Sequence, residues 1–215
     1  MIDYLKHIQT KMKYNPPVGI MLDAISKTGV KIIPFYLFLE GISGDDLPHL
    51  DTGFEDYDLS FLGEKDMDVI STFPFRNISR SQLQTRLDSG KMCLGLKYQR
   101  KLVAFSWCDL DECSYEGCKF PLKYDEAYLF DLYTPISFRG RGIAPYLRYQ
   151  MYQELFKLGR KRLYSISNRY NTASIRIKKK LNAKILYSGV YLELLKRWHV
   201  SSRVKYDKLG RQEIE

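Results

Sequence analysis

The chain has 215 residues and a formal net charge of +9, and 45% of its residues are hydrophobic. This composition indicates a folded globular protein and excludes an intrinsically disordered one. The longest apolar run, residues 32–39, is too short to cross a membrane, and the charged residues near Met1 do not form a secretory signal peptide.

The four cysteines do not have the spacing of a zinc site, and no His lies near them in the sequence. They are Cys93, Cys108, Cys113 and Cys118. We therefore expect reduced thiols, no bound metal and a cytoplasmic protein.

Charge is divided unevenly along the chain. Residues 1–135 hold 15 Lys and Arg against 20 Asp and Glu, whereas residues 136–215 hold 19 against 5. The basic part favours a polyanionic ligand. Nucleic acid would also gain from this charge, but the chain has no recognisable RNA- or DNA-binding motif, so we expect no nucleic-acid partner.

The first 55 residues predict two helices and a strand. Apolar residues at helical spacing predict helices over residues 2–13 and 17–28, and Gly29 ends the second. Residues 30–40 predict a strand, in which Pro34 favours an edge position or a bulge. The following segment, up to residue 58, has the composition of a loop.

Short strands and helices then alternate, joined in one place by a tight turn at Gln99-Arg100 that predicts a hairpin. The predicted elements are a strand at 57–62, helices at 64–73 and 79–88, strands at 92–98 and 102–109, a loop at 110–125, a strand at 127–134, a helix at 143–158, a strand at 162–167, a helix at 171–181, and strands at 184–188 and 191–195.

Residues 129–148 carry the most informative pattern. An apolar strand leads through a Pro-marked turn into Arg139, Gly140, Arg141, Gly142, Ile143 and Ala144. A helix follows with Leu147, Met151, Leu155 and Leu158 on one face. Glycines at the start of a helix let backbone N–H groups approach a ligand, and the helix N-terminus adds free donors and partial positive charge. Because neither a P-loop Lys-Ser/Thr nor a G-x-G-x-x-G pattern is present, this predicted pyrophosphate cradle points to coenzyme A.

The element order and two motifs resemble the GNAT acyltransferase superfamily over residues 56–196. The motif R/Q-x-x-G-x-G/A is present as Arg139, Gly142 and Ala144, and the second motif is present as Asn171, Ser174 and Ile177. The resemblance implies an α/β fold of layered α+β type, with a mixed, mostly antiparallel sheet flanked by helices. Residues 1–55 would form an N-terminal extension and residues 197–215 a basic tail.

The resemblance also implies an acyl-CoA-dependent N-acyltransferase that moves acetyl from acetyl-CoA to a primary amine by direct attack. The backbone of Leu132, Tyr133 and Thr134 would bind the pantetheine arm, and the amides from Arg139 to Ala144 would bind the pyrophosphate. Asn171 and Ser174 would line the pantetheine end. The expected acceptor is a small-molecule amine, such as an amino sugar, and a homodimer stays open. The alternatives are a long-chain acyl donor on coenzyme A or a carrier protein, and a non-catalytic coenzyme A-binding module.

The general acid is the point where the chain departs from the superfamily. Many members have Tyr where this chain has Lys178. Lys178 could stabilise the leaving thiolate as a cation, Tyr170 or a water could donate a proton, or the thiolate could leave without an acid, since a thiol is acidic, with a pKa of about 8.5. The alternative is that residues 178–180 form a solvated helix face beside a phosphate-rich ligand.

Deprotonation of the acceptor amine calls for a base, and a carboxylate is the usual choice. Asp131, on the central strand, is our first candidate and Glu126, at the start of that strand, the second. Because an unpaired buried carboxylate is unfavourable, the alternative for Asp131 is a structural bond to a backbone group or an Arg. Trp107 either packs in the core or forms the floor of the acceptor pocket.

Overall fold

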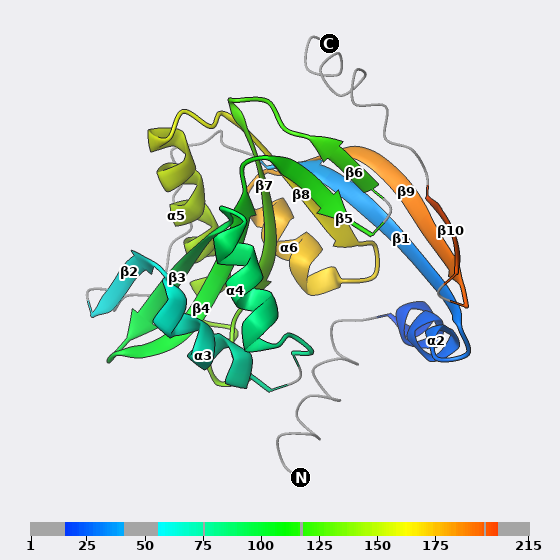
Figure 1. Ribbon diagram of the computed structural model, residues 1–215, viewed down its shortest axis with the longest axis horizontal. Helices are drawn as coiled ribbons and strands as arrows, with labels where there is room; N and C mark the ends of the chain where they lie inside the picture. The colour runs from blue at the N-terminus through cyan, green and yellow to red at the C-terminus, as the bar shows by residue number, and fades with distance from the viewer. Residues whose placement is uncertain (1–15, 41–55, 75, 117, 196, 202–215) are drawn as a thin grey trace. The chain divides into compact units, whose positions relative to one another are not determined.

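The computed structural model describes residues 16–40, 56–74, 76–116, 118–195 and 197–201. The fold is mixed α/β, with mostly antiparallel strands flanked by helices, as the sequence predicts (Figure 1). The described residues belong to two compact units that alternate along the chain. The terminal unit comprises residues 1–41, 112–121 and 164–215, and the central unit comprises residues 42–111 and 122–163.

The central unit contains four strands in the order β7-β4-β3-β2, each antiparallel to its neighbour. They are β2 (Tyr57–Phe61), β3 (Met92–Tyr98), β4 (Lys101–Asp109) and β7 (Glu126–Tyr133). β3 and β4 form the predicted hairpin. Its turn residues Gln99 and Arg100 have φ angles of 47° and 64°. This left-handed pair suits a two-residue turn between twisted strands.

Three helices accompany these strands: α3 (Glu64–Thr72), α4 (Arg80–Asp88) and α5 (Ile143–Lys157). α3 and α4 pack on a buried cluster that combines Leu62, Met67, Ile70, Leu83, Cys93, Leu102, Phe105 and Trp107. α5 contacts β3, β4 and β7. Leu147, Met151 and Leu155 are buried in α5 as predicted, whereas Leu158 is 52% exposed because it is the C-cap, after the last helical turn.

The start of α4 depends on a capping box. The Ser79 hydroxyl accepts from the backbone N–H of Gln82 at 3.2 Å, and the Gln82 side chain accepts from the N–H of Ser79 at 2.8 Å. We expect Ser79→Ala to lower the free energy of unfolding by about 1 kcal/mol, because the N–H of Gln82 in the first helical turn loses its acceptor. Urea unfolding measures this, with Ser71→Ala as the control. Equal midpoints for the two variants would contradict the capping role.

The terminal unit contains four strands in the order β10-β9-β1-β8, again antiparallel to one another. They are β1 (Val30–Leu39), β8 (Arg162–Asn168), β9 (Lys184–Leu194) and β10 (Trp198–Ser201), although the first two residues of β8 belong to the central unit. Helices α2 (Pro17–Ser26) and α6 (Thr172–Lys180) and a small hairpin of β5 (Glu112–Tyr115) and β6 (Cys118–Pro121) complete the unit. α2 contacts β1.

β1 lies between β8 and β9, so the expected edge position of Pro34 is wrong. The Pro34 carbonyl accepts from the N–H of Arg169 at 2.8 Å. The backbone nitrogen of Pro34, which carries no hydrogen, faces the same way, just beyond the last β1–β8 pair of Phe35 with Asn168. The strand pairing needs no N–H donor at that point, so proline is tolerated there. The register shift of β1 occurs later, between Leu37 and Phe38.

Three other predictions differ from the structure. The segment 110–125 contains the β5–β6 hairpin and is not a plain loop. The two strands expected around Gly189 are one strand, β9. A Cβ at Gly189 would lie 2.6 Å from the Phe35 ring, so this glycine makes room for packing and does not form a turn. A further strand, β10, lies in the segment 197–215 that was expected to form a basic tail, and the helix expected over 2–13 lies outside the described residues.

No helix in the described part of the chain is long and apolar enough to cross a membrane. All four cysteines are buried free thiols. Burial raises the pKa of the Cys108 thiol to about 12, which makes it a poor nucleophile. The described ranges contain no group of three His, Cys, Asp or Glu side chains that could hold a metal.

Candidate functional site

The segment before α5 presents a cluster of backbone N–H groups at the start of a helix. Gly140 and Gly142 have φ angles of 82° and 75°, a left-handed conformation that favours glycine. Gly142 is the N-cap and makes no side-chain capping bond. Among the described residues, the amides from Gly140 to Ala144 donate none of the backbone hydrogen bonds outside regular elements; the first such donor is Tyr146, to the Gly142 carbonyl. A helix start of this kind is suited to an anion.

The end of β7 is tied to this cradle by Arg139. Its Nε donates to the Thr134 carbonyl at 2.9 Å, across a short 3-10 turn, Ile136–Phe138. The Thr134 hydroxyl is buried and has no hydrogen-bond partner among the described residues. The structure thus places Leu132–Thr134 and Arg139–Ala144, the residues expected to bind coenzyme A, in the same unit. The motif arginine contributes its side chain here, which the sequence did not predict.

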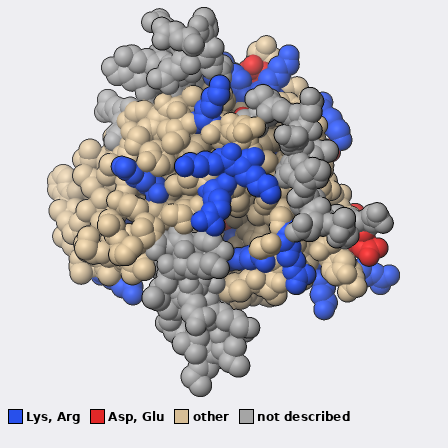
Figure 2. Space-filling model, turned by 180° about the vertical axis from the view of Figure 1, so that it is seen from behind, with Lys and Arg blue, Asp and Glu red and all other residues tan. Residues whose placement is uncertain are grey.

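Basic side chains prevail over acidic ones on the face drawn in Figure 2, in keeping with the net charge of +9. A positive field of this kind attracts a polyphosphate ligand and raises its rate of association.

Asp131 occupies a β-bulge. Phe105 pairs with Tyr133 and Trp107 pairs with Phe130, so two residues of β7 face one residue of β4. Asp131 has a φ of 49°, which Asp tolerates better than most residues. Bulges turn a side chain away from the regular alternation of a strand. The bulge therefore sets the direction of the Asp131 carboxylate.

Two arginines bind this carboxylate. Asp131 Oδ2 accepts from Arg76 Nη2 and from Arg86 Nη1, each at 2.6 Å. Burial by itself would raise the pKa of Asp131, but the hydrogen bonds and charges of Arg76 and then Arg86 outweigh it and hold the pKa below its usual value. A carboxylate with a lowered pKa is a weak base. This geometry favours the structural alternative, in which Asp131 is bonded to Arg.

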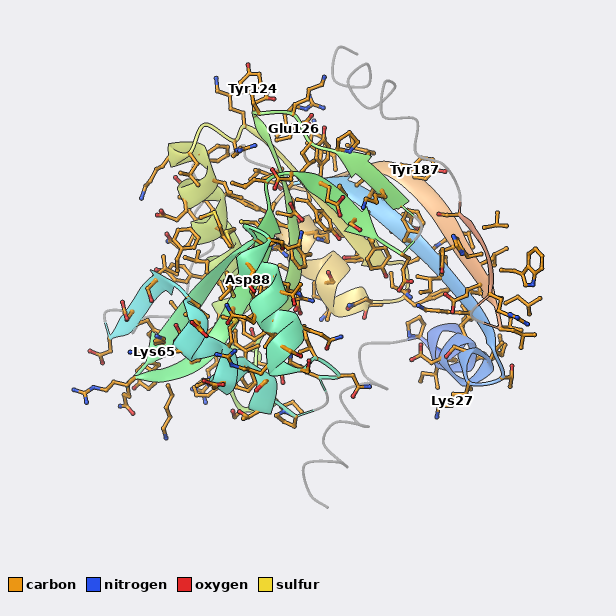
Figure 3. All side chains as sticks on the ribbon, in the orientation of Figure 1. Lys27, Lys65, Asp88, Tyr124, Glu126 and Tyr187 are labelled. Atoms are coloured by element: carbon orange, nitrogen blue, oxygen red, sulfur yellow. The ribbon has the colours of Figure 1, made fainter. Side chains whose placement is uncertain are left out.

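Glu126 lies at the start of β7 (Figure 3) and is 2% exposed. It accepts from the backbone N–H of Lys123 at 2.9 Å, and Arg162 Nε lies 3.7 Å away. Five residues of strand separate it from Asp131, a distance of about 16 Å at the usual rise per residue. The two candidate carboxylates are therefore not brought together.

Lys178 lies in the terminal unit and is 4% exposed. Its Nζ donates to Glu40 Oε1 at 3.0 Å and to the Ser165 hydroxyl, and lies 5.1 Å from the centre of the Phe38 ring. The expectation of a solvated face is correct for Lys179 and Lys180, which are exposed, and wrong for Lys178. The buried lysine belongs to an ion pair with Glu40.

The other two expected ligand residues of the terminal unit form the start of α6. Asn171 is the N-cap, and its Oδ1 accepts from the N–H of Ser174 at 3.1 Å. The hydroxyls of Ser174 and Ser167, the latter in β8, lie 2.8 Å apart. These bonds fix the beginning of the helix against its neighbouring strand.

Sequence reasoning missed the partners of Asp131 and Lys178, namely Arg76, Arg86 and Glu40. An Asp inside an apolar strand signals that a cation must lie near it, but not which one. Trp107 is fully buried and stacks on Phe130, so it packs in the core, which is one of its two predicted roles.

The model of the acetyltransferase (GNAT) family matches residues 55–182, which is more than half of the chain. No curated protein matches this chain.

Solved structures share the fold at low sequence identity. An acetyltransferase from the GNAT family of Colwellia psychrerythraea has a TM-score of 0.57 and 16% identity, over 83% of this chain and 63% of that one. A Drosophila malonogaster protein has a TM-score of 0.55 and 14% identity, over 86% of this chain and 60% of that one. The chain thus spans less than two thirds of the length of these two proteins.

Proposed function

Because this chain belongs to the acetyltransferase (GNAT) family, we propose that it is an acyl-CoA-dependent N-acyltransferase. The proposed donor is acetyl-CoA, and the proposed acceptor is a primary amine of a small molecule. The amine would attack the thioester directly, with no covalent enzyme intermediate. In this proposal coenzyme A supplies an acyl group activated as a thioester, and the chain supplies binding and orientation.

The observation that carries this proposal is the run of backbone N–H groups before α5, for which no acceptor is found among the described residues. Gly140 and Gly142 take left-handed angles, and the helix start has no side-chain cap. A side-chain cap would occupy the amides that a pyrophosphate needs. The buried, unpartnered hydroxyl of Thr134 adds a polar group at the end of β7, where the pantetheine arm would lie.

Neither Asp131 nor Lys178 supports a strong acid or base role. The first has its carboxylate bound by two arginines, and the second is paired with Glu40. We therefore propose that catalysis rests mainly on orientation of the amine and the thioester, which can supply a large part of a rate enhancement. The thiolate would leave without a dedicated acid, since its pKa is about 8.5 in a free thiol, and the proton released from the amine nitrogen would pass to water.

A thiol-release assay tests the activity. The protein is incubated with acetyl-CoA and with a panel of primary amines that includes amino sugars, amino acids and polyamines. We expect amine-dependent release of coenzyme A thiol with at least one of them. A parallel series of acyl-CoAs of increasing chain length separates acetyl transfer from the long-chain alternative, because a pocket limited to acetyl loses activity sharply as the chain grows.

A second candidate is a non-catalytic coenzyme A-binding module. The pairing of Lys178 with Glu40 favours it, because this lysine stands where many relatives have a proton-donating Tyr. Binding of acetyl-CoA without thiol release for any amine in the panel would support this candidate over the enzyme.

A homodimer and a cytoplasmic location stay predictions.

A further inference from the structure

An open pocket of about 510 Å³ lies entirely within the central unit. The segment between α3 and α4, the first turns of α4 and the bulge of β7 contribute its walls. The lining residues are Arg76, Asn77, Ile78, Gln82, Arg86 and Asp131.

The charges of this pocket do not balance. Arg76 and Arg86 bind the same oxygen of Asp131, Oδ2, so one carboxylate is shared by two guanidinium groups. Asp131 is the only acidic residue in the lining. One positive charge is therefore left over, and each guanidinium, which has five N–H donors, uses one nitrogen in this contact.

Aromatic rings hold both guanidinium groups in place. The Arg76 guanidinium lies 4.7 Å from the centre of the Phe105 ring and 4.9 Å from that of Tyr133. The guanidinium of Arg86 lies 5.3 Å from the Trp107 ring and 5.2 Å from the Phe130 ring. Cation–π contacts stabilise a guanidinium without neutralising it. The two cations are thus fixed in position while their excess charge is retained.

The remaining polar groups in the lining also offer donors. Gln82 uses its Oε1 to accept from the N–H of Ser79, which leaves its amino group free to donate. A pocket with surplus positive charge and N–H donors is complementary to an anion, above all to a planar carboxylate.

We propose that this pocket binds an anionic group, in the first place a carboxylate, of the acceptor amine. The inference rests on the proposed function, because it assigns the acceptor. Asp131 directly precedes the segment Leu132–Thr134 that we assign to the pantetheine arm. At the usual rise of a strand, Thr134 lies about 10 Å from Asp131. An amine separated from its carboxylate by several bonds can span that distance. Asp131 itself acts as a positioning residue that orients the two arginines.

Ligand binding to the folded protein is the first test. Melting temperatures are measured at constant ionic strength with 6-aminohexanoate, with its neutral amide 6-aminohexanamide, and with phosphoethanolamine against ethanolamine. We expect 6-aminohexanoate to raise the melting temperature and 6-aminohexanamide to have no effect. A rise with phosphoethanolamine alone would assign the pocket to a phosphate. Equal shifts for charged and neutral partners, or no shift with any of the four, would overturn the inference.

Variants distinguish binding in this pocket from a general effect of the protein's positive charge. Arg86→Gln should abolish the shift, and Arg86→Lys, which keeps the charge but not the planar donor pair, should retain only part of it. Arg80→Gln is the matched control, because Arg80 lies on the same helix, is partly exposed and pairs with Glu64 and Asp68. A shift that survives in Arg86→Gln, or that disappears equally in Arg80→Gln, would also overturn the inference.

Kinetics then connect the pocket to transfer. For an anionic amine that is acetylated, Arg86→Gln should raise KM roughly 10- to 100-fold with little change in kcat, as expected for lost binding of the ground state and transition state alike. The KM for a neutral amine should not change. Failure of acetyl-CoA to bind would refute the proposed function but would leave the anion-binding result intact, so the two failures are distinguishable.

Discussion

Lys178→Met is expected to lower the free energy of unfolding by about 3–5 kcal/mol, because it leaves the Glu40 carboxylate buried without its cation. Glu40 is 3% exposed and Lys178 is 4% exposed, so water cannot replace the lost contact. Chemical denaturation at neutral pH measures the loss.

Two controls distinguish the buried pair from the lysine-rich helix around it. Lys179→Met, one residue along and exposed, should change stability by no more than about 0.5 kcal/mol. The double variant Glu40→Gln/Lys178→Met should recover much of the stability, because it removes both charges. If Lys178→Met unfolded at the same denaturant concentration as Lys179→Met, the ion pair would have no role in stability.

Asp131→Asn is expected to lower stability at pH 7 by about 3 kcal/mol, because the carboxylate that holds Arg76 and Arg86 loses its charge. The effect depends on pH in a defined direction. The pKa of Asp131 is lowered in the folded protein, so its ionised form stabilises the fold above the unfolded pKa of about 3.9. This contribution is lost as the pH falls through the folded-state pKa. The difference in free energy of unfolding between the wild type and Asp131→Asn should therefore become smaller below about pH 4.

Turnover distinguishes a positioning role of Asp131 from that of a base. A general base contributes typically about 10²–10⁴-fold to the rate, so its loss would lower kcat by that factor and remove the acidic limb of the pH profile. We expect a smaller loss, mainly in KM for the acceptor, and an unchanged pH profile. Asp68→Asn, an exposed carboxylate paired with Arg80, serves as the control for both experiments.

Local patterns were sufficient to predict much of the fold. The hairpin at Gln99-Arg100, the capped α4 and the glycine-rich start of α5 are determined by residues close together in the sequence. For the same reason, the glycine turn that leads into α5 could be predicted, whereas coenzyme A binding there stays a prediction. Helical spacing also identified the buried face of α5, except at its last residue.

Contacts between distant segments could not be predicted in this way. β1 lies between β8 and β9, which follow it by more than a hundred residues. The sequence of an apolar strand does not indicate which other strands pair with it. Arg76 and Arg86 lie 55 and 45 residues from Asp131, and Glu40 lies 138 residues from Lys178. A sequence can indicate that a buried charge needs a partner, but only the fold selects which one.

A thermal-shift titration with acetyl-CoA tests the coenzyme A assignment most directly, with Gly142→Glu and Gly159→Glu measured beside the wild type. Both glycines have left-handed φ angles, of 75° and 76°, and they flank the two ends of α5. The two variants therefore differ mainly in whether the added negative charge lies at the start of the helix or at its end. At a free acetyl-CoA concentration of a hundred times Kd, binding adds about 2.7 kcal/mol to the free energy of unfolding. For a chain of this size, this raises the melting temperature by roughly 5–10 °C. We predict this rise in the wild type and in Gly159→Glu, and its loss in Gly142→Glu. A wild type that does not respond, or a Gly142→Glu variant that responds equally, would contradict the cradle.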